Sequence, residues 1–334
     1  MSKLRLGFYP YTYARVSVMK SLLFKPLQWQ GMLKMSVNEI LRTLQEGSYK
    51  QEIDELGPER KDLASLEMTL NRNMMSTLAK LKRISDEEVQ QVLKVYTKRY
   101  DVENFKTIIR SKMAGIPQEE AMGLIMPSIN YPDGYFTALL KKDSIQEILK
   151  ALQIQQPEGQ LELFNIENAL DKAYFEEIFQ LSENLSGEGK ALKDFIKAEL
   201  AILNIKIILR LKKEQFKQED ILKYLIQPGE KIAKLAGKTD VKEIIKSLYA
   251  MKYTVIKGDE TADEEDILAQ LEMELDTGLL KKEVLLMHQN PLTVDVILGF
   301  MFAKEIEIRN LKVLLKGKQI GLEDNYLNKL MVVA

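Results

Sequence analysis

The chain has 334 residues, of which 46% are hydrophobic and 29% are charged, and its formal net charge is −1. This length allows two or three hydrophobic cores, and the near-zero net charge excludes a global basic field that would attract nucleic acid. The absence of cysteine and the single histidine, His288, exclude disulfides, thiol catalysis and a histidine-rich metal site. For His288, which lies near an expected helix end, we expect a capping or solvated role.

The chain offers no candidate membrane span or signal peptide. Its longest uncharged runs, such as 121–132 and 296–303, are shorter than the roughly 20 residues that cross a bilayer. Lys3, Arg5 and Pro10 interrupt the segment where a signal peptide would need continuous apolar residues. We therefore expect a soluble cytoplasmic protein.

The stretch from Phe8 to Val16 is the richest in aromatic residues and leads into an amphipathic helical segment at 17–24. Such a cluster typically anchors a terminus to a core. The alternative is a partner surface, because tyrosine and arginine are enriched where interfaces carry their binding energy.

Three short helices begin with the same pattern: a Ser or Asp cap, Glu three residues later, and then apolar residues at helical spacing. This pattern predicts capping boxes, in which the two side chains satisfy free backbone N–H groups at a helix start. The three pairs are Ser36 with Glu39, Ser144 with Glu147, and Asp240 with Glu243.

Longer helices are predicted between these short ones. Apolar residues at Leu63, Leu66 and Leu70 begin one helix, and a cap at Ser85 with Glu88 begins another that stops near 115–117. Segments 126–134, 155–160 and 182–190 are expected loops or linkers. The acidic run 259–266 is expected to be a solvated loop before a helix N-terminus, with a metal site as the alternative.

Neither glycine-containing stretch that resembles a phosphate loop, at 187–191 or 237–239, has the leading glycine that such a loop needs. No strand alternation appears along the chain. The predicted fold class is therefore all-α, built from helical bundles, with no cofactor and no catalytic residue.

One nine-residue motif occurs three times, about a hundred residues apart: Asn, apolar, Lys, any, apolar, apolar, basic, any, Lys. The apolar positions fall on one helix face and the first two basic positions on another. Because like charges four residues apart repel, their repetition suggests a carboxylate supplied from elsewhere, and the alternative is a solvated basic face. The motif residues are Asn104, Lys106 and Arg110; Asn204, Lys206 and Arg210; and Asn310, Lys312 and Lys316.

The end of the chain, from Phe302 to Leu322 with Glu305 and Arg309, resembles the end of the C-type subunit of archaeal and bacterial V/A-type ATPases, the counterpart of the d-type subunit in the eukaryotic vacuolar pump. The beginning agrees with the same family at Tyr13 and Arg15, and again from Ser36 onward.

This resemblance implies three similar helical-bundle domains in a funnel-like pseudo-threefold arrangement. We expect modules at 1–98, 99–198 and 199–295, with the first completed by 296–334. It also implies a non-catalytic rotor subunit of a proton- or sodium-translocating ATPase. Such a protein lies on the cytoplasmic face of the membrane and couples central-shaft subunits of the D/F type to the ring of proteolipid subunits.

For the repeated motif, a structural role is expected: the asparagine bridges helix ends and the long cations pair with capping-box glutamates. The alternative is that some copies face the shaft. For the whole chain, the alternatives are an unrelated all-helical adaptor and, with less support, a helical enzyme using acidic metal sites.

Overall fold

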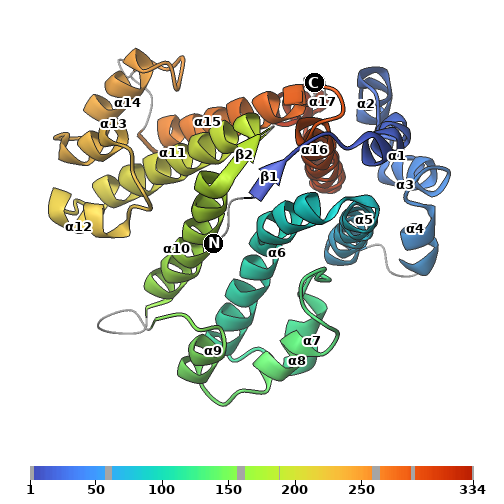
Figure 1. The fold of residues 1–334 in the computed structure, drawn as a ribbon, viewed down its shortest axis with the longest axis horizontal. Coiled ribbons are helices and arrows are strands. Elements are labelled where there is room, and N and C mark those ends of the chain that lie inside the picture. Colours follow the sequence, from blue (N-terminus) through green and yellow to red (C-terminus); the bar gives the residue numbers. More distant parts are fainter. Residues whose placement is uncertain are drawn as a thin grey trace.

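The computed structural model describes residues 4–56, 62–155, 162–187, 189–257, 264–286 and 290–332. It is almost entirely helical, as predicted (Figure 1). Among these residues, no helix has both the length and the apolar character that a membrane span requires. His288, most of the 155–160 segment and the first part of the acidic run lie outside the described residues.

Along the chain, two consecutive long helices alternate with groups of short ones. In chain order the elements are β1 (Leu4–Leu6), α1 (Pro10–Ser21), α2 (Pro26–Leu33), α3 (Val37–Gln45), α4 (Lys50–Leu56), α5 (Leu63–Ile84), α6 (Glu87–Met113), α7 (Gln118–Gly123), α8 (Tyr135–Leu140), α9 (Ile145–Ala151), α10 (Leu163–Asn184), β2 (Leu185–Gly187), α11 (Lys190–Lys213), α12 (Gln218–Tyr224), α13 (Glu230–Ala233), the 3-10 helix η1 (Lys234–Gly237), α14 (Val241–Ala250), α15 (Glu264–Leu286), α16 (Val294–Gln319) and α17 (Asp324–Leu330).

Three pairs of the longest helices that are not consecutive in the chain pack together: α6 with α10, α11 with α15, and α16 with α5. Neighbouring pairs also pack directly, through α5 with α6, α10 with α11, and α15 with α16. Figure 1 shows α6 and α10 leading side by side to α7–α9, and α11 and α15 leading to α12–α14. The third pair joins the two ends of the sequence, because α16 precedes the C-terminus and α5 follows α1–α4. Contacts of α16 with α1, and of α17 with α2, add to this joining of the chain ends.

The helices that carry the repeated motif end in the same way. Each is followed by a residue in the left-handed region: Gly115 (φ 67°), Gln215 (φ 60°) and Gly321 (φ 74°). The N–H of the next residue then donates to a carbonyl in the last helical turn, at 2.9–3.0 Å. This is the Schellman arrangement, which satisfies carbonyls that the helix end would leave free.

The predicted caps are present where the short helices α3, α9 and α14 begin. The oxygens of Ser36, Ser144 and Asp240 accept the N–H of the glutamate three residues later. In α3 the glutamate also accepts the N–H of Ser36, which completes the capping box. In α9 and α14 the glutamate instead accepts the N–H of the residue that precedes the N-cap, which is Asp143 in one case and Thr239 in the other.

Three details of the sequence interpretation were wrong. The N-cap of α6 is Asp86, because the hydroxyl of Ser85 donates back to the carbonyl of Leu81. The first helix begins at Pro10, within the aromatic stretch, because proline is well suited to a first helical turn. The expected loop at 182–190 instead contains the end of α10 and the short strand β2.

Strand β2 pairs with β1 in a parallel two-stranded sheet with Leu4 opposite Leu185 and Leu6 opposite Gly187. Strands of three residues are too short to show a recognisable alternation in sequence.

Candidate functional site

The three repeated asparagines make the same contact. Asn104 in α6, Asn204 in α11 and Asn310 in α16 are each 1% exposed. Each side-chain amide both donates to the carbonyl and accepts the N–H of one residue 22 positions later, at 2.7–2.9 Å. The partners are Met126, Ile226 and Val332. Each asparagine therefore holds the chain beyond the short helix that follows its own, in keeping with the predicted bridging role.

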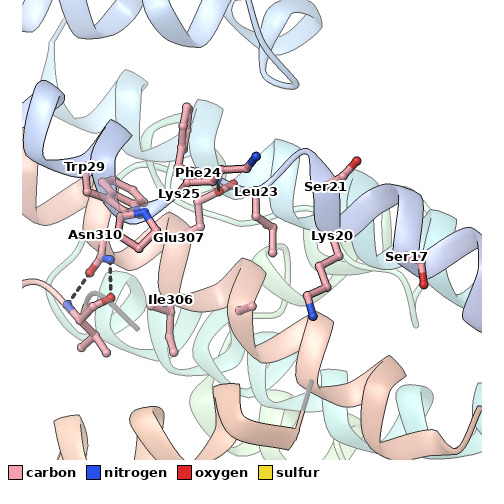
Figure 2. Close-up of a pocket in the computed structure, with 13 residues that line it drawn as sticks. Ser17, Lys20, Ser21, Leu23, Phe24, Lys25, Trp29, Ile306, Glu307 and Asn310 are labelled. Carbon is pink, nitrogen blue, oxygen red and sulfur yellow. Dashed lines mark hydrogen bonds between the residues drawn. The ribbon is translucent and has the colours of Figure 1, made fainter. Parts of the chain in front are cut away.

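Asn310 lies at a pocket of about 470 Å³ between α16 and the N-terminal helices. Figure 2 shows its two hydrogen bonds, with Trp29 and Glu307 nearby. The lining is mostly apolar and includes Leu23, Phe24 and Ile306. The pocket thus combines the middle of the last long helix with segments from the start of the chain.

The basic residues of the first two copies pair with carboxylates on the neighbouring long helix. Lys106 pairs with Asp171 at 2.6 Å, and Lys206 pairs with Asp276 at 2.6 Å. The basic residue one turn later does the same: Arg110 with Glu167 at 2.6 Å, and Arg210 with Glu272 at 3.0 Å. The acids, like the cations, are four residues apart, so each helix pair has two ion pairs one turn apart.

These partners correct part of the sequence interpretation. The carboxylates come from α10 and α15 and not from the capping-box glutamates, which are engaged with their own helix N-termini. Burial lowers the pKa of Lys106, but Asp171 and Glu103 together outweigh this effect, so the pKa of Lys106 is raised.

The third copy follows the same geometry with a different partner. Lys312 of α16 donates to the side-chain oxygen of Asn71 in α5 at 2.6 Å. Asn71 thus stands where Asp171 and Asp276 stand in the other two pairs. Burial lowers the pKa of Lys312, since no carboxylate of the described residues is in direct contact with it. Lys316 is exposed.

The last lysine of the motif binds the end of a short helix in two copies. Lys112 donates to the carbonyls of Leu140 and Lys142 at the end of α8. Lys318 donates to the carbonyl of Leu33 at the end of α2, and to Asp324 at 2.6 Å. A cation at a helix C-terminus is stabilised by the free carbonyls and by the helix dipole.

A second set of equivalent residues, which the sequence reasoning missed, meets where the long helices approach one another. Arg99, Glu199 and Glu305 each precede the repeated asparagine by five residues. Arg99 pairs with Glu199 at 2.9 Å. Glu305 accepts hydrogen bonds from Tyr96 at 3.3 Å and from Tyr100. We call Arg99, Glu199 and Glu305, with Tyr96, Tyr100 and Tyr174, the central junction.

Tyrosines connect the charges of the central junction. The guanidinium of Arg99 lies 3.7 Å from the centre of the Tyr96 ring and donates to the hydroxyl of Tyr174 at 3.1 Å. Burial lowers the pKa of Arg99, but Glu199, Tyr174, Tyr96 and Glu305 together outweigh this effect and hold this pKa well above its usual range. Burial raises the pKa of Glu305, and Arg99 opposes that shift. An alignment of the three copies of the repeated motif, extended by five residues before the asparagine, would have shown that Arg99, Glu199 and Glu305 are equivalent.

A buried ion pair within α16 is hydrogen-bonded to the N-terminal part of the chain. Lys304 contacts Glu307 at 2.9 Å, and both side chains are 4% exposed. The hydroxyl of Tyr49 donates to Glu307 at 2.5 Å, and the N–H of Phe24 donates to its other oxygen at 2.7 Å. Burial lowers the pKa of Lys304, with Glu307 opposing. The carboxylate of Glu307 thus has partners on both oxygens that come from a distant part of the sequence.

The family-like residues at the two ends of the chain do not form one site. Glu305 belongs to the central junction, and Arg309 lies one turn further along α16 with a buried nitrogen, Nη1, that lacks a hydrogen-bond partner among the described residues. Tyr13 packs against the main core and Arg15 is exposed. In the part of the chain that the structure describes, no cluster of three metal-ligating side chains is present. The contacts above fix helices relative to one another.

Comparison with known proteins identifies the family. A sequence model described as "ATP synthase (C/AC39) subunit" matches residues 12–330. The chain is 30% identical to the C-type subunit of the A-type ATP synthase of Methanosarcina mazei, over 97% of this chain and 93% of that protein. It is 32% identical to the corresponding protein of Archaeoglobus fulgidus, over 97% and 96% of the two chains. It is 26% identical to that of Haloferax volcanii, over 97% of each. The chain therefore belongs to the ATP synthase (C/AC39) subunit family.

Proposed function

We propose that this chain is the rotor subunit that couples the central shaft of an ATP synthase to its membrane proteolipid ring. Membership of the C/AC39 family makes it a structural, non-catalytic subunit of an ATP synthase. In this role the chain transmits torque between the part of the enzyme that hydrolyses or synthesises ATP and the part that transports protons or sodium ions. Its partners would be shaft subunits of the D/F type and the ring, with the chain peripheral to the membrane on the cytoplasmic side.

The observation that carries the proposal is the central junction. Arg99, Glu199 and Glu305 come from the same repeat position on three different long helices. Arg99 pairs with Glu199 and lies against the ring of Tyr96, whose hydroxyl donates to Glu305. A part that transmits torque must not deform internally under load. Direct ionic and aromatic contacts between the three long helices oppose such deformation, because moving one helix would separate partly buried charges.

We further propose three modules arranged as a funnel around a pseudo-threefold axis, near 1–98, 99–198 and 199–295, the first completed by 296–334. Matching contacts support this division. Asn310, Lys312 and Lys318 contact Val332, Asn71 and Leu33, much as Asn104, Lys106 and Lys112 contact Met126, Asp171 and Leu140. In the first module, these contacts would join segments from opposite ends of the chain.

For the repeated motif, the contacts favour the structural role over the shaft-facing one. The asparagines are buried, and Lys106 and Lys206 are committed to Asp171 and Asp276. Arg110 and Arg210 are the more exposed cations, with 48% and 67% of their side-chain surface accessible. Lys316, the equivalent cation of the third copy, is also exposed. If Arg110→Glu, Arg210→Glu and Lys316→Glu, alone and together, bind the shaft as the unchanged chain does, the shaft-facing alternative is excluded.

The proposed function is tested by retrieving the tagged chain from its own membranes in mild detergent and identifying every retained protein by mass spectrometry. We expect the small proteolipid and the shaft subunits together with the catalytic subunits. In parallel, the intact complex should be crosslinked and the linked peptides mapped, since a coupling role requires direct links to both shaft and ring. Recovery of an ATP synthase in which this chain links to neither would overturn the coupling role and favour a peripheral helical adaptor.

A further inference from the structure

The N-terminal segment 4–12, which we call the strap, contacts all three chain connections that link a long helix of one pair to a long helix of another. They are the connections α5–α6, α10–α11 and α15–α16. Three strap residues are almost completely buried: Leu6 (2% exposed), Tyr9 (5%) and Thr12 (0%). The burial of these three side chains fixes the strap to the rest of the molecule.

The first contact is with the connection between α10 and α11. Strand β1 pairs with β2 along its whole length, and the hydroxyl of Ser186 donates to the carbonyl of Leu4 at 3.3 Å. Gly187 has φ +70°, and a Cβ atom there would lie 2.2 Å from the carbonyl oxygen of Leu6. A glycine at 187 is therefore required for the strap to approach this closely.

The second and third contacts are made within the next six residues. The N–H of Tyr9 donates to the carbonyl of Leu292, just before α16, at 2.6 Å. The hydroxyl of Thr12 donates to the carbonyl of Ile84, the last residue of α5, at 2.8 Å. Strand β1 also packs against α6. Nine consecutive residues therefore contact three connections that are far apart in the sequence.

We propose that the strap acts as one unit that fixes the three helix pairs relative to one another. Each pair packs directly, and the ion pairs that link α6 to α10 and α11 to α15 do not involve the strap. Displacing the strap would therefore loosen the three connections together while each helix pair stays folded. This role concerns the chain itself and does not depend on the proposed coupling function.

The test uses the full chain with Gly187→Ala, which places a methyl group against the strap. Gly321→Ala is the matched control, because Gly321 has φ +74° and open space around its Cβ position. Both variants place a side chain at a positive φ and are therefore strained, and only the first displaces the strap. Peptide-level hydrogen exchange is followed at the strap, at the three connections and at the middle of α6, α11 and α16.

In Gly187→Ala we expect hydrogen exchange to be at least about tenfold faster in the strap and in all three connections. Two of these connections, at Ile84 and at Leu292, are not in contact with Gly187. The helix centres should keep their protection. The Gly321→Ala control should change only the end of α16. Faster exchange confined to the α10–α11 connection would overturn the proposal, because the strap would not then act as one unit.

A second variant covers the case in which Gly187→Ala unfolds the chain. Thr12→Val keeps the shape of the side chain and removes only its hydrogen bond to Ile84. If the strap acts as one unit, loosening it at Thr12 also loosens its pairing with β2. The rate of hydrogen exchange at β2 should therefore also rise, by at least about threefold. An effect restricted to the end of α5, or one spread equally over all helices, would contradict the proposal.

Discussion

Asn310 binds both backbone polar groups of Val332, and the side chain that makes these bonds is 1% exposed. Asn104 and Asn204 bind Met126 and Ile226 with the same separation of 22 residues. A short asparagine side chain has one donor group and one acceptor oxygen, so it can satisfy one peptide N–H and one carbonyl at the same point.

Replacing any of the three asparagines with alanine should destabilise the chain by about 2 kcal/mol or more, because two buried backbone groups would lose their partners. Urea unfolding measures the change. For Asn310→Ala, ending the chain at residue 331 should have a similar effect, and combining the two changes should add little because both remove the same contact. The exposed Asn328→Ala is the control, with an expected change within about 0.5 kcal/mol. Additive effects of the two changes would contradict this account.

Arg99 and Arg110 lie on the same helix and each pairs with a glutamate, but they differ in exposure. The side chain of Arg99 is 22% exposed and that of Arg110 is 48% exposed. Arg99→Met should cost about 3 kcal/mol of unfolding free energy, because it leaves Glu199 and Glu305 without a cation. Arg110→Met should cost at most about 1 kcal/mol, as for exposed ion pairs.

Arg99→Lys separates charge from geometry at the central junction. It keeps the positive charge but loses the planar group that stacks on Tyr96 and reaches Tyr174. We expect its stability to lie between those of the unchanged chain and Arg99→Met. Equal stability of all three would mean that the central junction contributes nothing to folding.

Asn71→Asp should stabilise the chain by about 1 kcal/mol, because it gives Lys312 the carboxylate that Lys106 and Lys206 already have. The reverse change at the equivalent position, Asp276→Asn, should destabilise by about the same amount. Thermal or urea unfolding of the two variants decides the point. Loss of stability in Asn71→Asp would show that the neighbouring Glu67 repels the new charge more than Lys312 attracts it.

The pH dependence gives a second readout of Asn71→Asp. Burial lowers the pKa of Lys312 in the folded chain, so the unfolded chain binds more protons between that pKa and about 10.4. Stability from this group therefore rises with pH over this range. With Asp at position 71 this rise should disappear, which unfolding curves between pH 8 and 10 would detect.

Burial raises the pKa of Tyr131 to about 12. The folded chain then holds the phenol proton over a range in which the unfolded chain, with a tyrosine pKa of about 10, loses it. The stability that this group contributes is present below about pH 10 and is lost as the pH rises towards 12. Tyr131→Phe should therefore lose less stability between pH 9 and 11.5 than the unchanged chain. Parallel losses in both proteins would contradict the raised pKa.

Much of the local structure could be predicted from sequence because its signals lie within a few residues. The caps at Ser36, Ser144 and Asp240 need a partner only three positions away. The apolar periodicity around Asn104, Asn204 and Asn310 was enough to identify the three long helices. The expectation of a carboxylate beside the repeated cations was confirmed at Lys106 and Lys206, and it was wrong at Lys312, which contacts the amide of Asn71.

The sequence by itself determined the all-helical class, the repeat and the starts of the three capped short helices, since these depend on hydrogen bonds and side-chain spacing within one or two turns. Only the tertiary structure decided which helices meet. Arg99 and Glu199 are a hundred residues apart, and β1 pairs with a strand about 180 residues later. Such contacts depend on how whole helices pack, and single side chains carry no local signal of their distant partner.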